Sequence, residues 1–308
     1  MTKIKRVLFF LLTIIICSVI YIERKPIIYK LSEIFRSDRE IVILPGNGYQ
    51  KKDSFLRVQQ VNDYVPHNYD DLINIFYSTL NQGWKDFVFY CPLEYDNCLK
   101  DVAKLSDNKE LLSEINNYVH PYNGYSTIKT LYDSDGKVSL HIEYLYNSEE
   151  IEKIDNEINR IMSNTLNNNM DTITKVKVLH NYIVNNTKYD KVREETNSSE
   201  YDSSRMTGLL FDGYAVCSGY ADVMSVMLDK LNIKNFRISS STHVWNAVFL
   251  NDKWYHLDVT WDDPVTHDGS DLLDYNYFLI DTDKLFSLDH NKNEHSFDEN
   301  FYLEFKKD

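Results

Sequence analysis

The longest apolar run of the chain lies near its N-terminus. Residues 7–22 contain no charged side chain, and basic residues precede the run at Lys3, Lys5 and Arg6. The run is shorter than the ~20 residues that usually span a bilayer, and it has no small-x-small cleavage pattern, so an export signal and an anchor are both open. The basic cluster favours a cytoplasmic N-terminus. Residues 1–25 are therefore predicted to be a membrane anchor or uncleaved signal through residues 7–22, with the globular part extracytoplasmic.

Beyond the anchor, residues 26–147 alternate between short helical and strand-like patterns. The clearest signal is Asp133-Ser-Asp-Gly136 between two alternating runs, because Asp-Gly favours a hairpin turn. This part of the chain is predicted to be an accessory α+β domain. Its expected elements are helices over 70–80 and 108–118 and strands over 84–90, 126–132 and 138–146.

From residue 148 the apolar spacing becomes helical. One stripe contains Ile151, Ile154, Ile158 and Ile161, and a second helical stripe runs from Ile173 to Ile183. Residues 185–204 are polar and too long for a tight connection, so we expect an exposed loop beside a site. Residues 148–308 are predicted to form the catalytic domain.

A cysteine opens the next helical pattern. Cys217 precedes the apolar positions Val223, Val226 and Met227, so it should lie at the start of a helix. The unpaired N–H groups and partial positive charge of a helix N-terminus favour a thiolate. Cys217 is therefore a candidate nucleophile. Of the other three cysteines, Cys17 belongs to the apolar run near the N-terminus. If Cys217 must stay a free thiol, Cys91 and Cys98 are left as a possible disulfide pair, and the sequence does not decide whether they are bridged.

Two strand-like runs, 243–250 and 254–261, follow the helix. If Asn251-Asp252 forms a two-residue turn, Leu250 opposes Lys253 and Trp245 opposes Asp258. His243 shares the face of Trp245, because side chains alternate along a strand, so His243 and Asp258 become diagonal neighbours. A three-residue connection without a bulge would place them on opposite faces. The pattern thus predicts a catalytic set of Cys217, His243 and Asp258, in which the thiol attacks an acyl carbon, His243 transfers the proton and Asp258 orients the imidazole.

These residues lie within motifs that resemble the transglutaminase-like superfamily. They are Val216-Cys-Ser-Gly-Tyr-Ala221, His243-Val-Trp-Asn246 and Asp258-Val-Thr-Trp-Asp-Asp-Pro264. The resemblance covers about residues 148–281 and implies a papain-like α+β core, with the cysteine helix packed on an antiparallel sheet that carries the histidine and the aspartate. It includes residues 277–281 as a further strand. Nothing in the chain matches the calcium-binding and barrel domains of animal transglutaminases, so crosslinking activity does not follow.

Charge narrows the possible partners. The chain has 33 basic and 47 acidic residues and a net charge of −14, which disfavours binding to nucleic acid. The acidic residues of 262–274 miss the EF-hand spacing and are expected to form a solvated loop, so no metal and no cofactor are predicted.

The predicted function is a cell-surface thiol acyl-transfer enzyme. It would act on protein or peptide amides through a thioester, with water (a cysteine protease or amidase) or an amine (a transglutaminase) as second acceptor. The alternative is a catalytically inactive domain that serves as a surface protein-binding or adhesion module.

Overall fold

The computed structural model describes residues 3–22, 41–264, 272–288 and 294–306. The chain divides into two compact units, Met1–Ile43 and Leu44–Asp308. The first unit contains helix α1, Lys3–Ile22, which covers the apolar run predicted to be an anchor. Among the residues that the structure describes, no helix combines the length and the apolarity needed to cross a bilayer. The anchor stays a prediction.

The second unit begins with three helices and an antiparallel sheet of order β1-β3-β2. The predicted helices and strands of this part are present within a few residues of the expected bounds. The elements are α3 (Tyr69–Gln82), β1 (Asp86–Tyr90), α4 (Cys98–Asp107), α5 (Lys109–Asn117), the 3-10 turn η1 (Pro121–Asn123), β2 (Tyr125–Tyr132) and β3 (Lys137–Tyr144).

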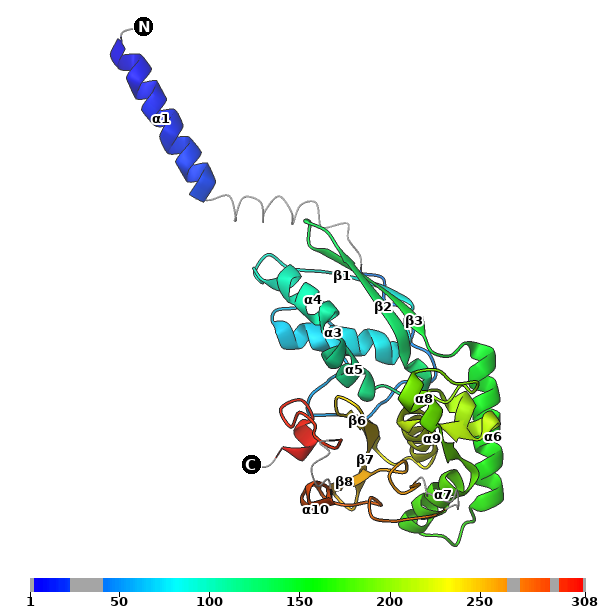
Figure 1. The fold of residues 1–308 in the computed structure, drawn as a ribbon. Coiled ribbons are helices and arrows are strands. Elements are labelled where there is room, and N and C mark those ends of the chain that lie inside the picture. Colours follow the sequence, from blue (N-terminus) through cyan, green and yellow to red (C-terminus); the bar gives the residue numbers. More distant parts are fainter. Residues whose placement is uncertain (1–2, 23–40, 265–271, 289–293, 307–308) are drawn as a thin grey trace. The chain divides into compact units, whose positions relative to one another are not determined.

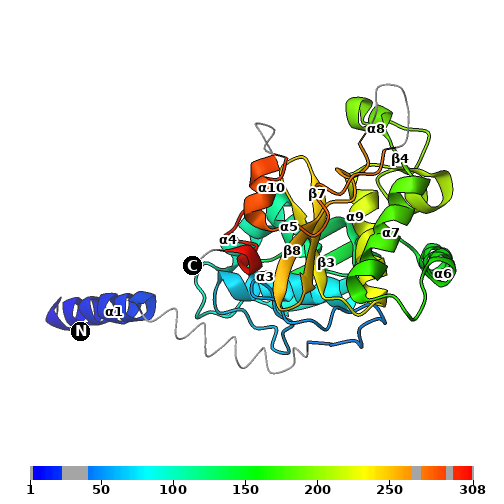
Figure 2. The ribbon, with the colours of Figure 1, turned by 90° about the horizontal axis from the view of Figure 1, so that it is seen from below.

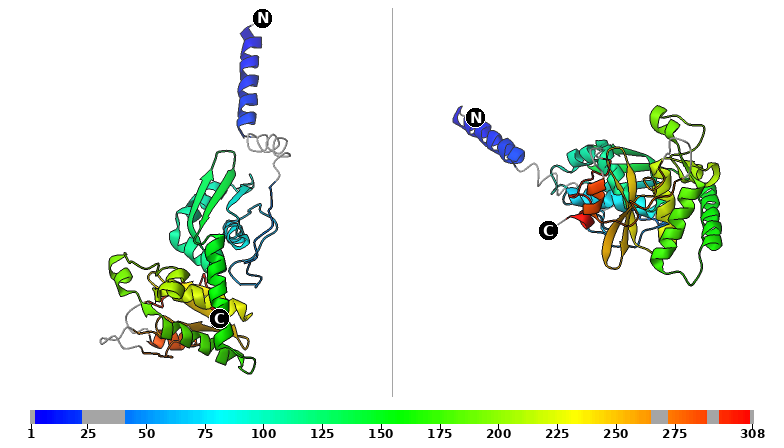
Figure 3. Two further views of the ribbon diagram at one scale, coloured as in Figure 1. Left: turned by 90° about the vertical axis from the view of Figure 1, so that its right-hand side faces the viewer. Right: turned by 60° about the horizontal axis from the view of Figure 1, so that its bottom comes forward.

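The hairpin between β2 and β3 forms where the sequence predicted it. The Asp133 carboxylate accepts hydrogen bonds from the backbone N–H groups of Asp135 and Lys137, and Gly136 adopts φ +82°, which a glycine tolerates without strain. Tyr132 lies opposite Val138 in the register. The hairpin leads directly into α6, Ser148–Thr165 (Figure 3).

Cys91 and Cys98 form a disulfide with a Cα–Cα distance of 5.7 Å. The bridge joins the end of β1 to the first residue of α4. It resolves the question that the sequence left open, and among the described residues it leaves Cys17 and Cys217 as free thiols.

The second half of this unit is built around the helix that the cysteine opens. Its elements are α6, α7 (Thr172–Asn186), β4 (Lys188–Tyr189), α8 (Lys191–Thr196), the π-helical turn η2 (Gly208–Asp212), β5 (Tyr214–Ala215), α9 (Cys217–Lys230), β6 (Asn235–Ser239), β7 (Val244–Leu250), β8 (Lys253–Leu257), α10 (Thr282–Leu288) and η3 (Leu303–Phe305) (Figure 1). Strands β6, β7 and β8 form an antiparallel sheet in that order, and β4 pairs with β5 in parallel.

Helix α9 packs on β6 and β7, α7 packs on α9, and α6 packs on α7, while α10 contacts β8. Figure 2 shows β7 and β8 between α10 on one side and α9, α7 and α6 on the other. This mixed α and β core has the predicted layout of a cysteine helix on an antiparallel sheet, and its helical stripes are buried as expected. Ile173 is an exception, since it is 47% exposed at the start of α7.

Two local predictions in this half need correction. Residues 185–204 are not a plain loop, because they contain β4 and α8. Residues 277–281 form no assigned strand, although Ile280 makes a bridge to His256 at the edge of β8.

A buried arginine, Arg237, connects the two halves. Arg237 on β6 pairs with Asp222 on α9, and its second terminal nitrogen donates to the carbonyls of Asn116 (2.6 Å) and Val119 (3.1 Å), which lie at the end of α5. Both charged side chains are at most 7% exposed. Leu44–Asp308 is accordingly one compact unit, and a domain boundary at residue 147 stays a prediction.

Candidate active site

Cys217 is the first residue of α9. The preceding Val216 is extended (φ −102°, ψ 176°), so the chain passes from the short strand β5 straight into the helix. Gly219, the third residue of the helix, is so closely packed that an added Cβ would be 3.0 Å from the Cβ of Ala215 and 3.1 Å from the Ser203 carbonyl oxygen. The thiol is free and half-buried. The predicted position at a helix N-terminus is confirmed.

The hairpin of β7 and β8 has the predicted register. Leu250 pairs with Lys253, and the two turn residues Asn251 and Asp252 have φ values of +51° and +60°. Two positive φ values belong to the type I′ turn, whose twist matches that of the flanking strands. The face that carries Trp245 therefore also carries His243 and Asp258.

His243 lies just before β7, and its imidazole meets the carboxylate of Asp258. The His243 Nε2 atom is 2.6 Å from Oδ2 of Asp258. The backbone N–H of His243 donates to the hydroxyl of Ser240 (3.0 Å), which holds the turn that enters the strand. Because Nε2 is engaged by the carboxylate, Nδ1 is the ring nitrogen left for the thiol.

Asp258 terminates β8 and is 1% exposed. Its Oδ1 atom accepts hydrogen bonds from the backbone N–H groups of Thr260 (3.0 Å) and Trp261 (3.2 Å). This local turn explains why the strand ends at Leu257, earlier than the predicted run to residue 261, since an aspartate that binds its own following backbone competes with strand pairing.

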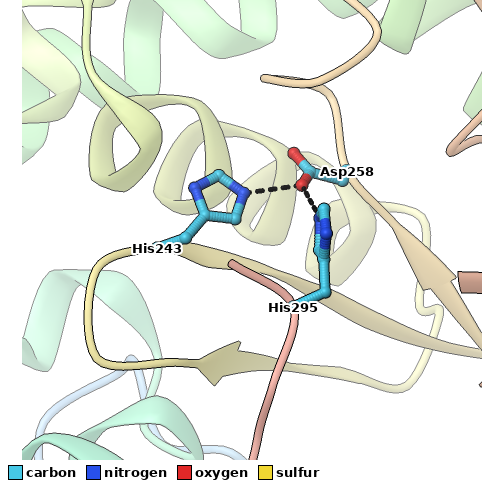
Figure 4. Close-up of side chains that lie close together, drawn as sticks. All are labelled: His243, Asp258 and His295. Carbon is cyan, nitrogen blue, oxygen red and sulfur yellow. Dashed lines mark hydrogen bonds and ion pairs between the residues drawn. The ribbon is translucent and has the colours of Figure 1, made fainter. Parts of the chain in front are cut away.

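A second histidine, which the sequence analysis did not identify, completes the arrangement. The Nε2 atom of His295 is 2.8 Å from the same Oδ2 atom of Asp258. Figure 4 shows the carboxylate between the two rings, with the other ring nitrogen of His243 facing away from it. His295 stands 37 residues beyond Asp258 in a polar segment. No periodicity or motif marks His295 in the sequence. The one available signal was the presence of a histidine that no predicted element explained.

The electrostatics favour a charged imidazole beside a carboxylate. Burial alone would lower the pKa of His243, but the charge and hydrogen bond of Asp258, with a further contribution from Cys217, raise it to about 10. Burial alone would raise the pKa of Asp258, yet the interactions with His243 and His295 hold it well below its usual range. The site therefore stabilises the charged forms of His243 and Asp258 together. A charged imidazole is the form of the ring that can stabilise a neighbouring thiolate.

One group among the described residues has donor atoms close enough to consider a metal ion, namely His243, Asp258 and His295, whose atoms lie within 4.8 Å of one another. Two ligands about 2.0 Å from a tetrahedral ion would be about 3.3 Å apart. The nitrogen–oxygen distances here are 2.6 and 2.8 Å. Their spacing is that of hydrogen bonds rather than of coordination.

The acidic residues after the hairpin are only partly as expected. Asp262 is completely buried and contacts Nε2 of His180 at 3.1 Å, and Asp263 accepts a hydrogen bond from the hydroxyl of Tyr220. These two carboxylates are structural and not part of a solvated loop. Asp268 and Asp271 lie outside the described residues.

A cavity of about 550 Å³ opens on the β4 and β5 side of the site. Tyr214, which lines it, lies three residues before Cys217, and Tyr189, also in its wall, has a pKa that burial and then the neighbouring Cys217 raise. Tyr201 stacks on Tyr214 with ring centroids 4.0 Å apart. Tyr189 thus links the wall of the cavity to the neighbourhood of the thiol.

Comparison with known proteins agrees with the resemblance. Residues 159–259 match the family model of the transglutaminase-like superfamily. The match includes Cys217, His243 and Asp258 and ends one residue after the last of them.

Solved structures give weak similarity. One is described as a crystal structure of a TGase, with 15% identity, a TM-score of 0.35, and coverage of 44% of this chain and 45% of that chain. Another is a "putative cysteine protease" from Cytophaga hutchinsonii, with 12% identity, a TM-score of 0.29, and coverage of 50% of this chain and 69% of that chain. The chain thus spans less than half the length of the first. No curated protein matches the chain.

Proposed function

We propose that this protein is a thiol enzyme that transfers an acyl group from a protein or peptide amide through a thioester on Cys217. The observation that carries the proposal is the 2.6 Å contact between His243 Nε2 and Asp258 Oδ2, with the thiol at the N-terminus of the helix that packs on the same sheet. The family match over residues 159–259 supports a cysteine-type enzyme.

The chemistry follows from the positions of the three side chains. The Cys217 sulfur attacks the amide carbon, a C–S bond forms, and the C–N bond breaks as His243 gives its proton to the departing nitrogen. Asp258 holds the imidazole in the orientation that directs Nδ1 to the sulfur and stabilises the charged ring. The N–H of Cys217, at the first position of α9, is a donor for the oxyanion that forms during attack.

The thioester then reacts with water or with an amine. Both outcomes begin with the same acyl-enzyme, and a site that admits an amine while excluding water would favour transfer over hydrolysis. One wall of the cavity is Tyr189, whose pKa Cys217 helps to raise, and we propose that the cavity receives part of the substrate or of the acceptor.

We further propose that the enzyme works outside the cytoplasm, attached to the membrane through residues 7–22. The basic residues before the apolar run support this orientation. The Cys91–Cys98 disulfide supports an oxidising compartment. Fractionation of cells and protease treatment of intact cells would test the placement, and recovery of the full-length protein in the soluble cytoplasmic fraction would contradict it.

The activity is tested by incubating the full-length protein with a mixture of peptides and a labelled primary amine. Mass spectrometry distinguishes cleavage, deamidation and amine incorporation, because each changes the peptide mass differently. We expect one of these products from the unsubstituted protein and from the control Cys17→Ala, and none from Cys217→Ala. Equal turnover by Cys217→Ala would refute the thiol mechanism. No product from any of the three would favour the alternative of a binding module.

A further inference from the structure

We propose that His295 is a positioning residue for the nucleophile, which acts by fixing the carboxylate of Asp258 in line with His243. The inference rests on the proposed function, since it assigns His295 a part in the activation of Cys217. It begins from the sharing of one carboxylate oxygen by two imidazoles (Figure 4).

The carboxylate of Asp258 is held at both oxygens. Oδ1 accepts from the backbone N–H groups of Thr260 and Trp261, and Oδ2 is 2.6 Å from His243 and 2.8 Å from His295. The backbone contacts fix one side of the group, whereas the partners of Oδ2 among the described residues are the two imidazoles. Asp258 Oδ2 sets the orientation of the His243 ring. Without His295, the described partner of this oxygen would be the His243 ring alone, so nothing independent of that ring would hold the oxygen in place.

His295 is suited to this task because its own ring cannot move freely. It is completely buried. Its centroid lies 5.0 Å from that of Tyr277, in a stacked arrangement, and 5.0 and 5.4 Å from those of Trp245 and Trp261. Packing on several sides sets the imidazole orientation before any substrate binds, which is the kind of support that a precise catalytic geometry needs.

The segment that carries His295 is itself attached to the sheet. Phe297 contacts the rings of Trp245 and His256, and the hydroxyl of Tyr302 accepts a hydrogen bond from the backbone N–H of Ser239 on β6. Residues 295–302 thus pack against the sheet and contact Asp258 through His295. The active arrangement therefore depends on residues well beyond the matched family segment 159–259.

The chemistry of the two groups shows which atom donates in the hydrogen bond between His295 and Asp258. An ionised carboxylate only accepts hydrogen bonds, so each imidazole must present an N–H at Nε2. His295 is consequently a donor to Asp258, while Nε2 of His243 donates to the same oxygen and leaves Nδ1 for the sulfur of Cys217. The second donor limits rotation of the carboxylate away from His243 during proton transfer.

Two substitutions separate donation from packing. His295→Gln keeps an N–H donor at a similar reach, whereas His295→Met fills the volume without one. In a Cys17→Ala background, the rate of alkylation of Cys217 by iodoacetamide at neutral pH reports on activation of the thiol and needs no substrate. We expect His295→Met to react about tenfold more slowly, and His295→Gln to remain within about threefold of the parent. Thermal unfolding confirms that both variants are folded.

The proposal would be overturned if Cys217 in His295→Met were alkylated at the parent rate. It would also be overturned if the rate fell equally in His295→Gln and His295→Met, because that result would indicate a packing role alone. If His295→Met does not fold, ¹⁵N NMR of the unsubstituted protein decides the question: Nε2 of His295 must carry a proton, and an unprotonated Nε2 overturns the proposal. Failure here differs from failure of the proposed function, because loss of turnover in Cys217→Ala is measured separately and does not depend on His295.

Discussion

Replacement of Asp258 by asparagine removes the charge beside His243 and keeps the size of the side chain. The structure gives the magnitude to expect. The pKa of His243 is about 10 against an ordinary value of 6.5, and it is raised to this value although burial opposes the rise. At 1.36 kcal/mol per unit, the surroundings favour the imidazolium by roughly 5 kcal/mol. In Asp258→Asn the burial remains and the attraction of the carboxylate is lost, so the pKa of His243 should fall.

The consequence is measurable at the sulfur. In a Cys17→Ala background, iodoacetamide should alkylate Cys217 rapidly from mildly acidic to neutral pH, because the imidazolium stabilises the thiolate. A pKa difference of this size corresponds to roughly 3 × 10³ in the protonation equilibrium of His243, but Cys217 supplies part of the attraction. We therefore expect Asp258→Asn to react about 100-fold more slowly at neutral pH.

The matched control is Asp252→Asn in the turn of the same hairpin. Asp252 is exposed, and asparagine tolerates its φ of +60°. This variant should be alkylated at the parent rate. If Asp258→Asn were alkylated as fast as this control at neutral pH, the ion pair would not activate the thiol, and the reasoning from the His243 pKa would be refuted.

Three further outcomes can be checked by thermal unfolding. Because the folded pKa of His243 is raised, its stabilisation is fully present below about pH 6.5 and is lost as pH rises through about 10, so the melting temperature of the parent should fall more over this window than that of Asp258→Asn. Arg237→Met strands the buried carboxylate of Asp222 and should cost about 3–5 kcal/mol, or roughly 6–20 °C, whereas Met at the exposed Arg160 should change little; equal effects would contradict the ion-pair argument. Reduction of the Cys91–Cys98 bridge, whose cysteines are 7 residues apart, should cost about 2.5 kcal/mol by loop entropy, and dithiothreitol should have no such effect on a variant with serine at both positions.

Much of the core could be predicted from the sequence because its determinants are local. Helical apolar spacing marked α6 and α9, and the position of Cys217 at the start of α9 followed from that spacing. The contact between His243 and Asp258 was also predictable, since a two-residue turn at Asn251 and Asp252 sets the register of every pair in the hairpin.

The sequence by itself therefore determined which side chains lie on one face of a helix or hairpin, because periodicity and turn chemistry act over a few residues. Only the tertiary structure decided that His295 meets Asp258, that Asp262 is buried against His180, and that Arg237 reaches the carbonyls at the end of α5. These contacts join segments with no shared period. Their partners are set by how whole elements pack, and a buried polar group must then find its hydrogen bond with whichever distant residue that packing brings near.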